Sequence, residues 1–222
     1  MPPRIYLVRH AQSGNNAQPV EQRTDDPSIT CLGHQQAEKV AERLAVLSLG
    51  SLVCSAFRRA LQTAYWISRS TRLVPEVIVD LHERGGCYAG WQEANFTGMP
   101  GLTPVEVVSE FGPVQLPGCY PKSGWWGSRP RESQEACAQR AVRMADELKT
   151  RVRLCEKSIV CVTHADFLSQ LLLAMLGDEL RDDEGFSDLK NAGITQVGLD
   201  ETGWKLYELN SVDHLPDLLV TS

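Results

Sequence analysis

The alternation of apolar and polar residues along the chain predicts strands and helices that follow each other in turn. Four short apolar runs are typical of buried strands and lie at 5–8, 51–54, 77–79 and 158–163. Apolar residues with helical spacing predict helices at 32–49, 59–68, 133–152 and 167–176. Two more strands, 194–199 and 204–209, are expected to form a hairpin around Gly203. This order predicts an α/β fold, a three-layer α/β/α sandwich with a mainly parallel central sheet and an antiparallel edge strand.

The regular pattern is interrupted between residues 85 and 132. Six prolines and three of the five tryptophans fall in this stretch, with one short helix expected at 104–111. A long irregular insertion in a compact domain is usually functional or disordered, and the tryptophans argue against disorder. We therefore expect one domain over 1–222, with 85–132 as an irregular excursion that covers the active site. The polar stretch 15–30 and the charged run 178–184 are interpreted as loops.

Composition excludes several classes of function. The 222 residues carry a formal net charge of -6, which argues against a nucleic-acid or anionic-membrane surface. No apolar stretch reaches the roughly 18 residues that a membrane span needs. The seven cysteines are scattered and form no C-x-x-C pair, so reduced thiols in a cytoplasmic protein are expected. The oligomeric state stays open, with a homodimer as one alternative.

Charged and polar side chains gather where the predicted strands end. The first strand runs into Arg9 and His10, and the strand at 158–163 runs into His164. The second strand is followed by Ser55 and Arg59, and the third by Glu83. Carboxyl ends of parallel strands share one edge of a sheet, where ligands bind in open α/β folds. Arginines, a neutral imidazole and a carboxylic acid suit phosphoryl transfer, in which positioning and charge stabilisation dominate.

Six sequence blocks resemble the histidine phosphatase superfamily, the phosphoglycerate-mutase-like group. They occur in the family order and cover most of the chain: Val8 to Asn16, Ile29 to Ala37, Ser55 to Ala64, Leu81 to Glu83, Val162 to Ala165 and Asn210 to Leu215. Each block alone is weak evidence for this family, whereas the six blocks together are specific to it. The chain departs from the family pattern at Ala11 and Ala165, where glycine is usual after each histidine. Glycine permits a positive φ, so alanine fits only where φ is negative.

The resemblance implies a phosphomonoester hydrolase with His10 as the nucleophile that becomes a phosphohistidine. It implies Glu83 as general acid and base, and no metal or other cofactor. The phosphoryl oxygens would be bound by Arg9, Asn16, Arg59, His164 and Ala165. The expected substrate is a small phosphorylated metabolite or a phosphoprotein.

Two other functions remain as alternatives. A phosphoglycerate-mutase-type phosphotransferase would return the phosphoryl group to a second hydroxyl, but residues 86–98 do not resemble the lid motif of dedicated mutases. A phosphate-binding relative with little catalysis is the other alternative, and the intact set of charged residues argues against it.

Two further interpretations concern side chains outside the predicted catalytic set. Asp166 is expected to cap the helix that follows His164, and Trp125, Trp126, Arg129 and Arg131 line a specificity pocket or form a separate packed cluster.

Overall fold

The computed structural model describes residues 2–177 and 188–222, and its centre is a six-stranded sheet. The sheet order is β3-β2-β6-β1-β7-β8. The strands are β1 (Arg4–Arg9), β2 (Leu49–Cys54), β3 (Pro75–Val77), β6 (Ser158–Thr163), β7 (Ile194–Leu199) and β8 (Trp204–Ser211). The first four pair in parallel, whereas β7 runs antiparallel to β1 and β8 antiparallel to β7. The mainly parallel sheet and the closing hairpin are confirmed, and two strands rather than one form the antiparallel edge.

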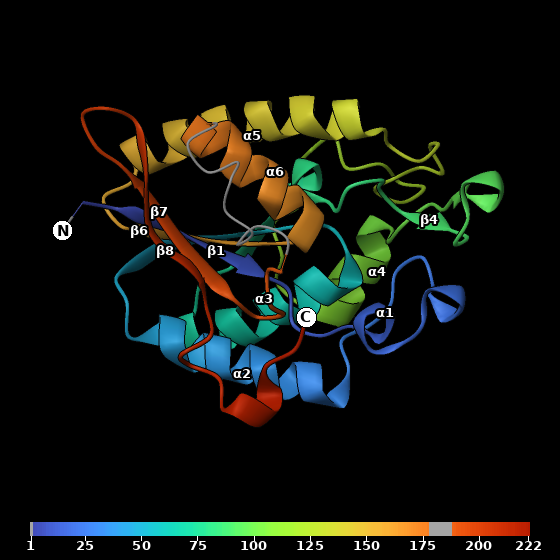
Figure 1. Cartoon of the computed structure of the whole chain (residues 1–222), viewed down its shortest axis with the longest axis horizontal. Coiled ribbons are helices and arrows are strands. Elements are labelled where there is room, and N and C mark those ends of the chain that lie inside the picture. The colour runs from blue at the N-terminus through green and yellow to red at the C-terminus, as the bar shows by residue number, and fades with distance from the viewer. Residues whose placement is uncertain (1, 178–187) are drawn as a thin grey trace.

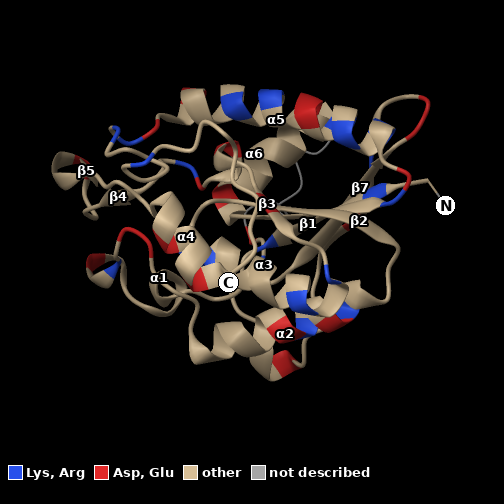
Figure 2. Cartoon of the chain, turned by 180° about the vertical axis from the view of Figure 1, so that it is seen from behind, with Lys and Arg blue, Asp and Glu red and all other residues tan. Residues whose placement is uncertain are grey.

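Helices cover both faces of the sheet and make the three predicted layers (Figure 1). One face carries α2 (Cys31–Ala45) and α3 (Arg58–Thr71), and the other α5 (Gln134–Leu154) and α6 (Ala165–Leu176). Strand side chains alternate between two cores, because successive residues of a strand point to opposite faces. Val160 packs in the core under α2 and α3, and Ile159 in the core under α5 and α6. Lysines, arginines and acidic residues lie on the outer sides of α2 and α5 (Figure 2). No helix among the described residues is both long and apolar enough to span a membrane.

Two element boundaries differ from the prediction. The helix expected at 32–49 ends at Ala45, and Gly50 lies inside β2 rather than ending the helix. The register of β2 against β6 shifts at this point, and a Cβ on Gly50 would lie 3.0 Å from the Cβ of Lys157. Gly50 therefore lets β2 and β6 approach each other closely. The strand expected at 77–79 is β3, which ends at Val77 and is followed by a 3₁₀ turn, Val79–Leu81.

The remaining elements lie beyond the carboxyl ends of the parallel strands (Figure 1). The polar stretch 15–30 is not entirely loop, since it contains most of the short helix α1 (Gly14–Ala17) and a 3₁₀ turn, Val20–Gln22. The excursion 85–132 contains a two-stranded sheet, β4 (Tyr88–Ala89) and β5 (Thr97–Gly98), and the expected helix, α4 (Pro104–Phe111). The charged run at 178–184, interpreted as a loop, lies outside the described residues.

Candidate active site

His10 follows β1 directly and is held in one tautomer. Its backbone N–H donates to the Thr163 carbonyl at 2.9 Å, which continues the β1–β6 ladder by one residue. Its Nδ1 lies 2.7 Å from the Ala11 carbonyl oxygen, which can only accept, so Nδ1 carries the proton. Nε2 therefore keeps a lone pair. Burial lowers the pKa of His10 well below its usual value, and Arg59 and Arg9 lower it further, so the ring is neutral.

Two buried guanidiniums flank the neutral imidazole. Arg59, in the first turn of α3, donates from Nε to His10 Nε2 at 3.0 Å. Within the described residues, its two Nη groups make no hydrogen bond, and Arg59 lines a cavity. Arg9, the last residue of β1, donates from Nη1 to the Leu189 carbonyl. Arg59 therefore contacts the nitrogen lone pair of His10, and Arg9 adds a second positive charge near the ring.

His164 ends the parallel strand next to β1 and lies beside His10. The two ring centroids are 5.0 Å apart in an edge-to-face arrangement. His164 Nε2 lies 2.8 Å from the hydroxyl of Ser55, which follows β2. This hydroxyl also accepts from the Phe57 N–H, and its own proton has no other acceptor within the described residues. We therefore assign the hydrogen bond as Ser55 O–H to Nε2, which leaves the proton of neutral His164 on Nδ1.

Glu83 is held at the N-terminal end of α6. Its carboxylate accepts backbone N–H groups from Arg84 at 2.8 Å and from Phe167 at 2.9 Å. Burial raises the pKa of Glu83, and the Asp166 carboxylate raises it further. The prediction that Asp166 caps the helix is wrong, because His164 is the capping residue and Asp166 lies in the first turn, paired with Arg84. Glu83 also does not end a strand directly, since the 3₁₀ turn comes between.

Arg140 fixes the segment that leads to Glu83, and sequence reasoning missed this role. It lies in α5, makes a bidentate ion pair with Glu132, and donates to the carbonyls of Asp80 at 2.6 Å and His82 at 3.0 Å. Arg140 lies on the buried face of α5, at helical spacing from the apolar residues Cys137 and Met144. A charged residue on such a face needs a buried partner, and that signal was available.

Asn16 is oriented by a network that reaches the C-terminal tail. Its Oδ1 accepts from the Ser13 N–H, the Ser13 hydroxyl and the Nδ2 of buried Asn191. Asn191 Oδ1 in turn accepts from the Thr221 hydroxyl at 3.1 Å. With its oxygen occupied, the side chain of Asn16 has its Nδ2 donor available toward the cavity that it lines. Asn191 lies next to β7, and nothing in its sequence context identified it.

A cavity of about 420 Å³ collects most of the predicted residues. Its lining includes six of them: Arg9, His10, Asn16, Arg59, Glu83 and Ala165. His164 is fully buried behind His10 rather than on the cavity wall. The two alanines fit without backbone strain, because neither Ala11 nor Ala165 has a positive φ.

The excursion 85–132 supplies one wall of the cavity and also several side chains of the core. Trp125 and Trp126 are buried, so these two side chains belong to the packed interior. Arg131 lines the cavity and stacks on two rings that line it as well, with its guanidinium carbon 5.2 Å from the Tyr88 centroid and 4.5 Å from the Phe96 centroid. The two tryptophans are part of the core under α2 and α3, so the prediction of a separate packed cluster is wrong, and the specificity pocket stays a prediction. Within the segments that the structure describes, no group of three His, Cys, Asp or Glu side chains could hold a metal ion.

Comparisons with known proteins identify the family of this chain. A model of the histidine phosphatase superfamily (branch 1) matches residues 5–212, and the chain belongs to this superfamily. It is 28% identical over 179 residues to a glucosyl-3-phosphoglycerate phosphatase of Mycolicibacterium vanbaalenii, which covers 78% of this chain and 74% of the relative. It is 26% identical to a putative phosphoserine phosphatase 2 of Hydrogenobacter thermophilus, over 97% and 98% of the two chains.

A solved structure shares the fold across nearly the whole chain. The phosphoserine phosphatase of Entamoeba histolytica in complex with 3-phosphoglyceric acid superposes with a TM-score of 0.65 at 23% identity. The match covers 96% of this chain and 99% of that one. The predicted phosphoglycerate-mutase-like fold is confirmed.

Proposed function

We propose that this phosphatase of the histidine phosphatase superfamily hydrolyses phosphomonoesters through a covalent intermediate on His10. One observation carries the proposal: the buried, neutral His10 presents an unprotonated Nε2 beside Arg59 in a cavity that Arg9 and Glu83 also line. A neutral imidazole nitrogen is a competent nucleophile at phosphorus. Its low pKa keeps it unprotonated at neutral and mildly acidic pH.

In the first step, His10 Nε2 attacks phosphorus in line with the bond to the leaving oxygen. The N–P bond forms, the P–O bond to the alcohol breaks, and Glu83 donates its proton to the departing oxygen. The raised pKa of Glu83 favours the protonated carboxyl that this step needs. In the second step a water molecule gives a proton to the Glu83 carboxylate and attacks phosphorus, which releases phosphate and restores His10.

The phosphoryl oxygens are assigned to donors that surround His10. Arg59 offers its Nη groups, which make no hydrogen bond within the described residues, Asn16 its Nδ2, and Arg9 its charge. His164 does not line the cavity, but its ring lies against that of His10 and its Nδ1 has no partner within the described residues, so we assign this proton to an oxygen of the phosphoryl group on His10. Preorganised cations and N–H donors stabilise the charge on a transferring phosphoryl group, a role that metal ions fill in other phosphotransferases.

The proposed substrate class is a small phosphorylated metabolite. The cavity volume of about 420 Å³ is in the range of small-molecule sites. The two relatives are named for glucosyl-3-phosphoglycerate and phosphoserine, and the neighbouring structure contains 3-phosphoglyceric acid. Arg131, which contacts two aromatic rings on the wall of the cavity, is suited to a second anionic group on the leaving alcohol.

A phosphate-release screen tests the proposal. Phosphoserine, phosphoglycerates, sugar phosphates, nucleotides and phosphopeptides are compared, with and without 2,3-bisphosphoglycerate and with and without a chelator. We expect hydrolysis of small phosphomonoesters that neither addition changes. Phosphoryl transfer to a second hydroxyl that depends on 2,3-bisphosphoglycerate would instead support the mutase alternative, and a loss of activity with chelator would contradict metal independence.

Glu83→Gln should slow hydrolysis of alkyl phosphates by roughly 10²- to 10⁴-fold, because the leaving alkoxide then lacks a proton donor. Hydrolysis of p-nitrophenyl phosphate should change far less, since its phenolate leaves without protonation. Glutamine keeps the oxygen that accepts the two backbone N–H groups, so the segment should stay in position. The measurement is kcat/KM for both ester classes at acidic pH.

The matched control is Glu38→Gln, the same substitution at an exposed residue of α2 that does not line the cavity. Under the same conditions this variant should leave kcat/KM for both ester classes within about threefold of the wild type. Equal losses on the two esters in the Glu83 variant would contradict the general-acid assignment.

A further inference from the structure

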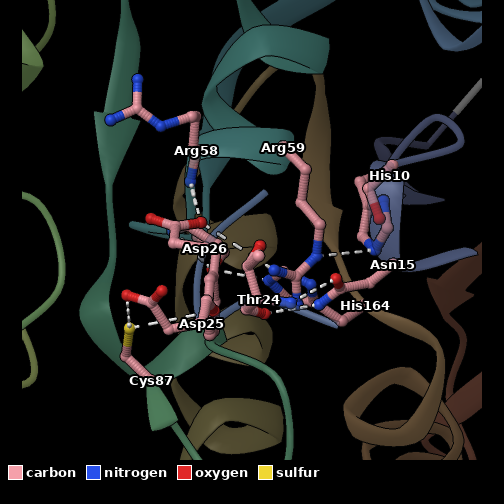
Figure 3. Close-up of polar contacts among 12 residues, drawn as sticks. His10, Asn15, Thr24, Asp25, Asp26, Arg58, Arg59, Cys87 and His164 are labelled. Atoms are coloured by element: carbon pink, nitrogen blue, oxygen red, sulfur yellow. Dashed lines mark hydrogen bonds and ion pairs between the residues drawn. The ribbon is translucent and has the colours of Figure 1, made fainter. Parts of the chain in front are cut away.

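A second carboxylate, Asp26, lies on the opposite side of Arg59 from His10 (Figure 3). The guanidinium of Arg59 donates from Nε to His10, and its Nη1 lies 3.9 Å from Asp26 Oδ1. That distance exceeds a hydrogen bond, so the two groups interact through charge alone. Oδ1 is held instead by the backbone N–H of Arg58, at 2.9 Å, where α3 begins. Asp26 therefore attracts Arg59 without fixing its Nη donors.

The other oxygen of Asp26 is buried and unpaired. Oδ2 has no hydrogen-bond partner within the described residues, and only 9% of the side chain is exposed. A buried carboxylate oxygen without a donor is costly when it carries charge, and protonation removes that cost. Burial raises the pKa of Asp26 to about 7, against the opposing effect of Arg59.

The surroundings of Asp26 hold few groups that would mask this titration. Two cations face it from α3, Arg59 and Arg58, and Arg58 is itself paired with Glu110 of α4. Asp25 precedes it on the same loop. Cys87 and Tyr120 face it from the excursion, and burial raises the pKa of each, so both are neutral.

We propose that Asp26 is a positioning residue that binds a proton when a phosphoryl group binds to Arg59, and releases it when phosphate leaves. The proposal rests on the phosphoryl site proposed above. A proton from solvent adds to the carboxylate, and no other bond changes. The reason is competition: an ionised Asp26 and a phosphoryl group share one guanidinium, and two like charges near each other favour protonation of the weaker acid.

The consequence is a pH dependence of phosphate affinity that belongs to Asp26. Below its pKa, Asp26 is neutral and Arg59 presents its whole charge to the ligand. Above this pKa, phosphate either binds beside the ionised carboxylate, which repels it, or binds together with a proton. The affinity for phosphate therefore falls by up to about tenfold for each pH unit. Glu83 and phosphate itself also titrate. The effect of Asp26 is therefore measured as the difference in proton uptake and phosphate affinity between the wild type and a variant that cannot ionise at this position.

The test is calorimetric binding of inorganic phosphate to the wild type and to Asp26→Asn, in buffers of different ionisation enthalpy and at pH values on both sides of neutrality. Asparagine keeps an oxygen for the Arg58 N–H and removes the charge. Above neutrality, wild type should take up as much as about one more proton per phosphate than the variant. The ratio of their affinities should fall with pH, with the variant binding more tightly at alkaline pH. Asp146→Asn, at an exposed residue of α5 that does not line the cavity, is the matched control and should keep the wild-type proton uptake.

Two outcomes decide between the claims. Equal proton uptake in wild type and Asp26→Asn, with phosphate bound by both, would overturn the role of Asp26 and leave the proposed function intact. Failure of the wild type to bind phosphate would overturn the phosphoryl site as well. If Asp26→Asn melts at a much lower temperature, Asp26→Ala replaces it, since alanine adds no unpaired amide, and the same difference in proton uptake is expected.

Discussion

His10→Ala should lower kcat/KM by roughly four orders of magnitude or more, the scale expected when a covalent nucleophile is removed. The other groups around the cavity, Arg9, Arg59 and Asn16, would remain. The variant should therefore still bind inorganic phosphate while losing turnover. Steady-state kinetics on the best substrate and calorimetric phosphate binding measure the two properties separately.

His34→Ala is the matched control for this experiment. His34 is exposed, contacts Trp66 and does not line the cavity, so its replacement should leave kcat/KM within about threefold. Substantial residual hydrolysis by His10→Ala, with the same substrate preference as the wild type, would rule out His10 as the nucleophile.

Arg59→Ala should lower kcat/KM by roughly 30- to 5000-fold. The substitution removes one partner of a buried charge contact with the phosphoryl group, a loss of about 2 to 5 kcal/mol. It also removes the N–H that contacts His10 Nε2 and one of the charges that lower the pKa of His10. The acid limb of the pH–rate profile should therefore move to higher pH. Kinetics across pH measure both effects.

Arg58→Ala provides a neighbouring control, because this side chain points away from His10 and pairs with Glu110 (Figure 3). Its backbone N–H, which contacts Asp26, is retained. We expect less than about a threefold change for this variant. A change of that size for Arg59→Ala would mean that Arg59 does not bind the phosphoryl group.

The predicted site residues that the structure brings together are mostly those that follow the end of a strand. His10 and His164 each follow an apolar run directly, and parallel pairing of those runs brings the two rings together. Arg59 is the second residue of α3, the helix that follows β2 after a short connection, so its position also follows from the end of a strand. Local pattern determines these positions, and tertiary packing adds little to them.

The remaining features of the site depend on contacts between residues far apart in sequence. Glu83 reaches the cavity through a 3₁₀ turn that Arg140 holds from another helix, nearly sixty residues away. Asn191 orients Asn16 from a position next to β7, and Asp26 meets Arg59 from a polar loop. Hydrophobic periodicity carries no information on such polar contacts. The end of the helix that begins at Cys31 was misjudged for a related reason, because Gly50 serves close strand pairing, which a single segment does not reveal.

Trapping the covalent intermediate tests the central claim most directly. The wild type is mixed with a substrate labelled in its phosphoryl group, stopped within one turnover under alkaline conditions that preserve phosphohistidine, and digested. The account predicts one acid-labile label per chain, on the peptide that contains His10, and no label in His10→Ala. A fully active enzyme that carries no label at any time during turnover, or carries it on a residue other than His10, would contradict the account.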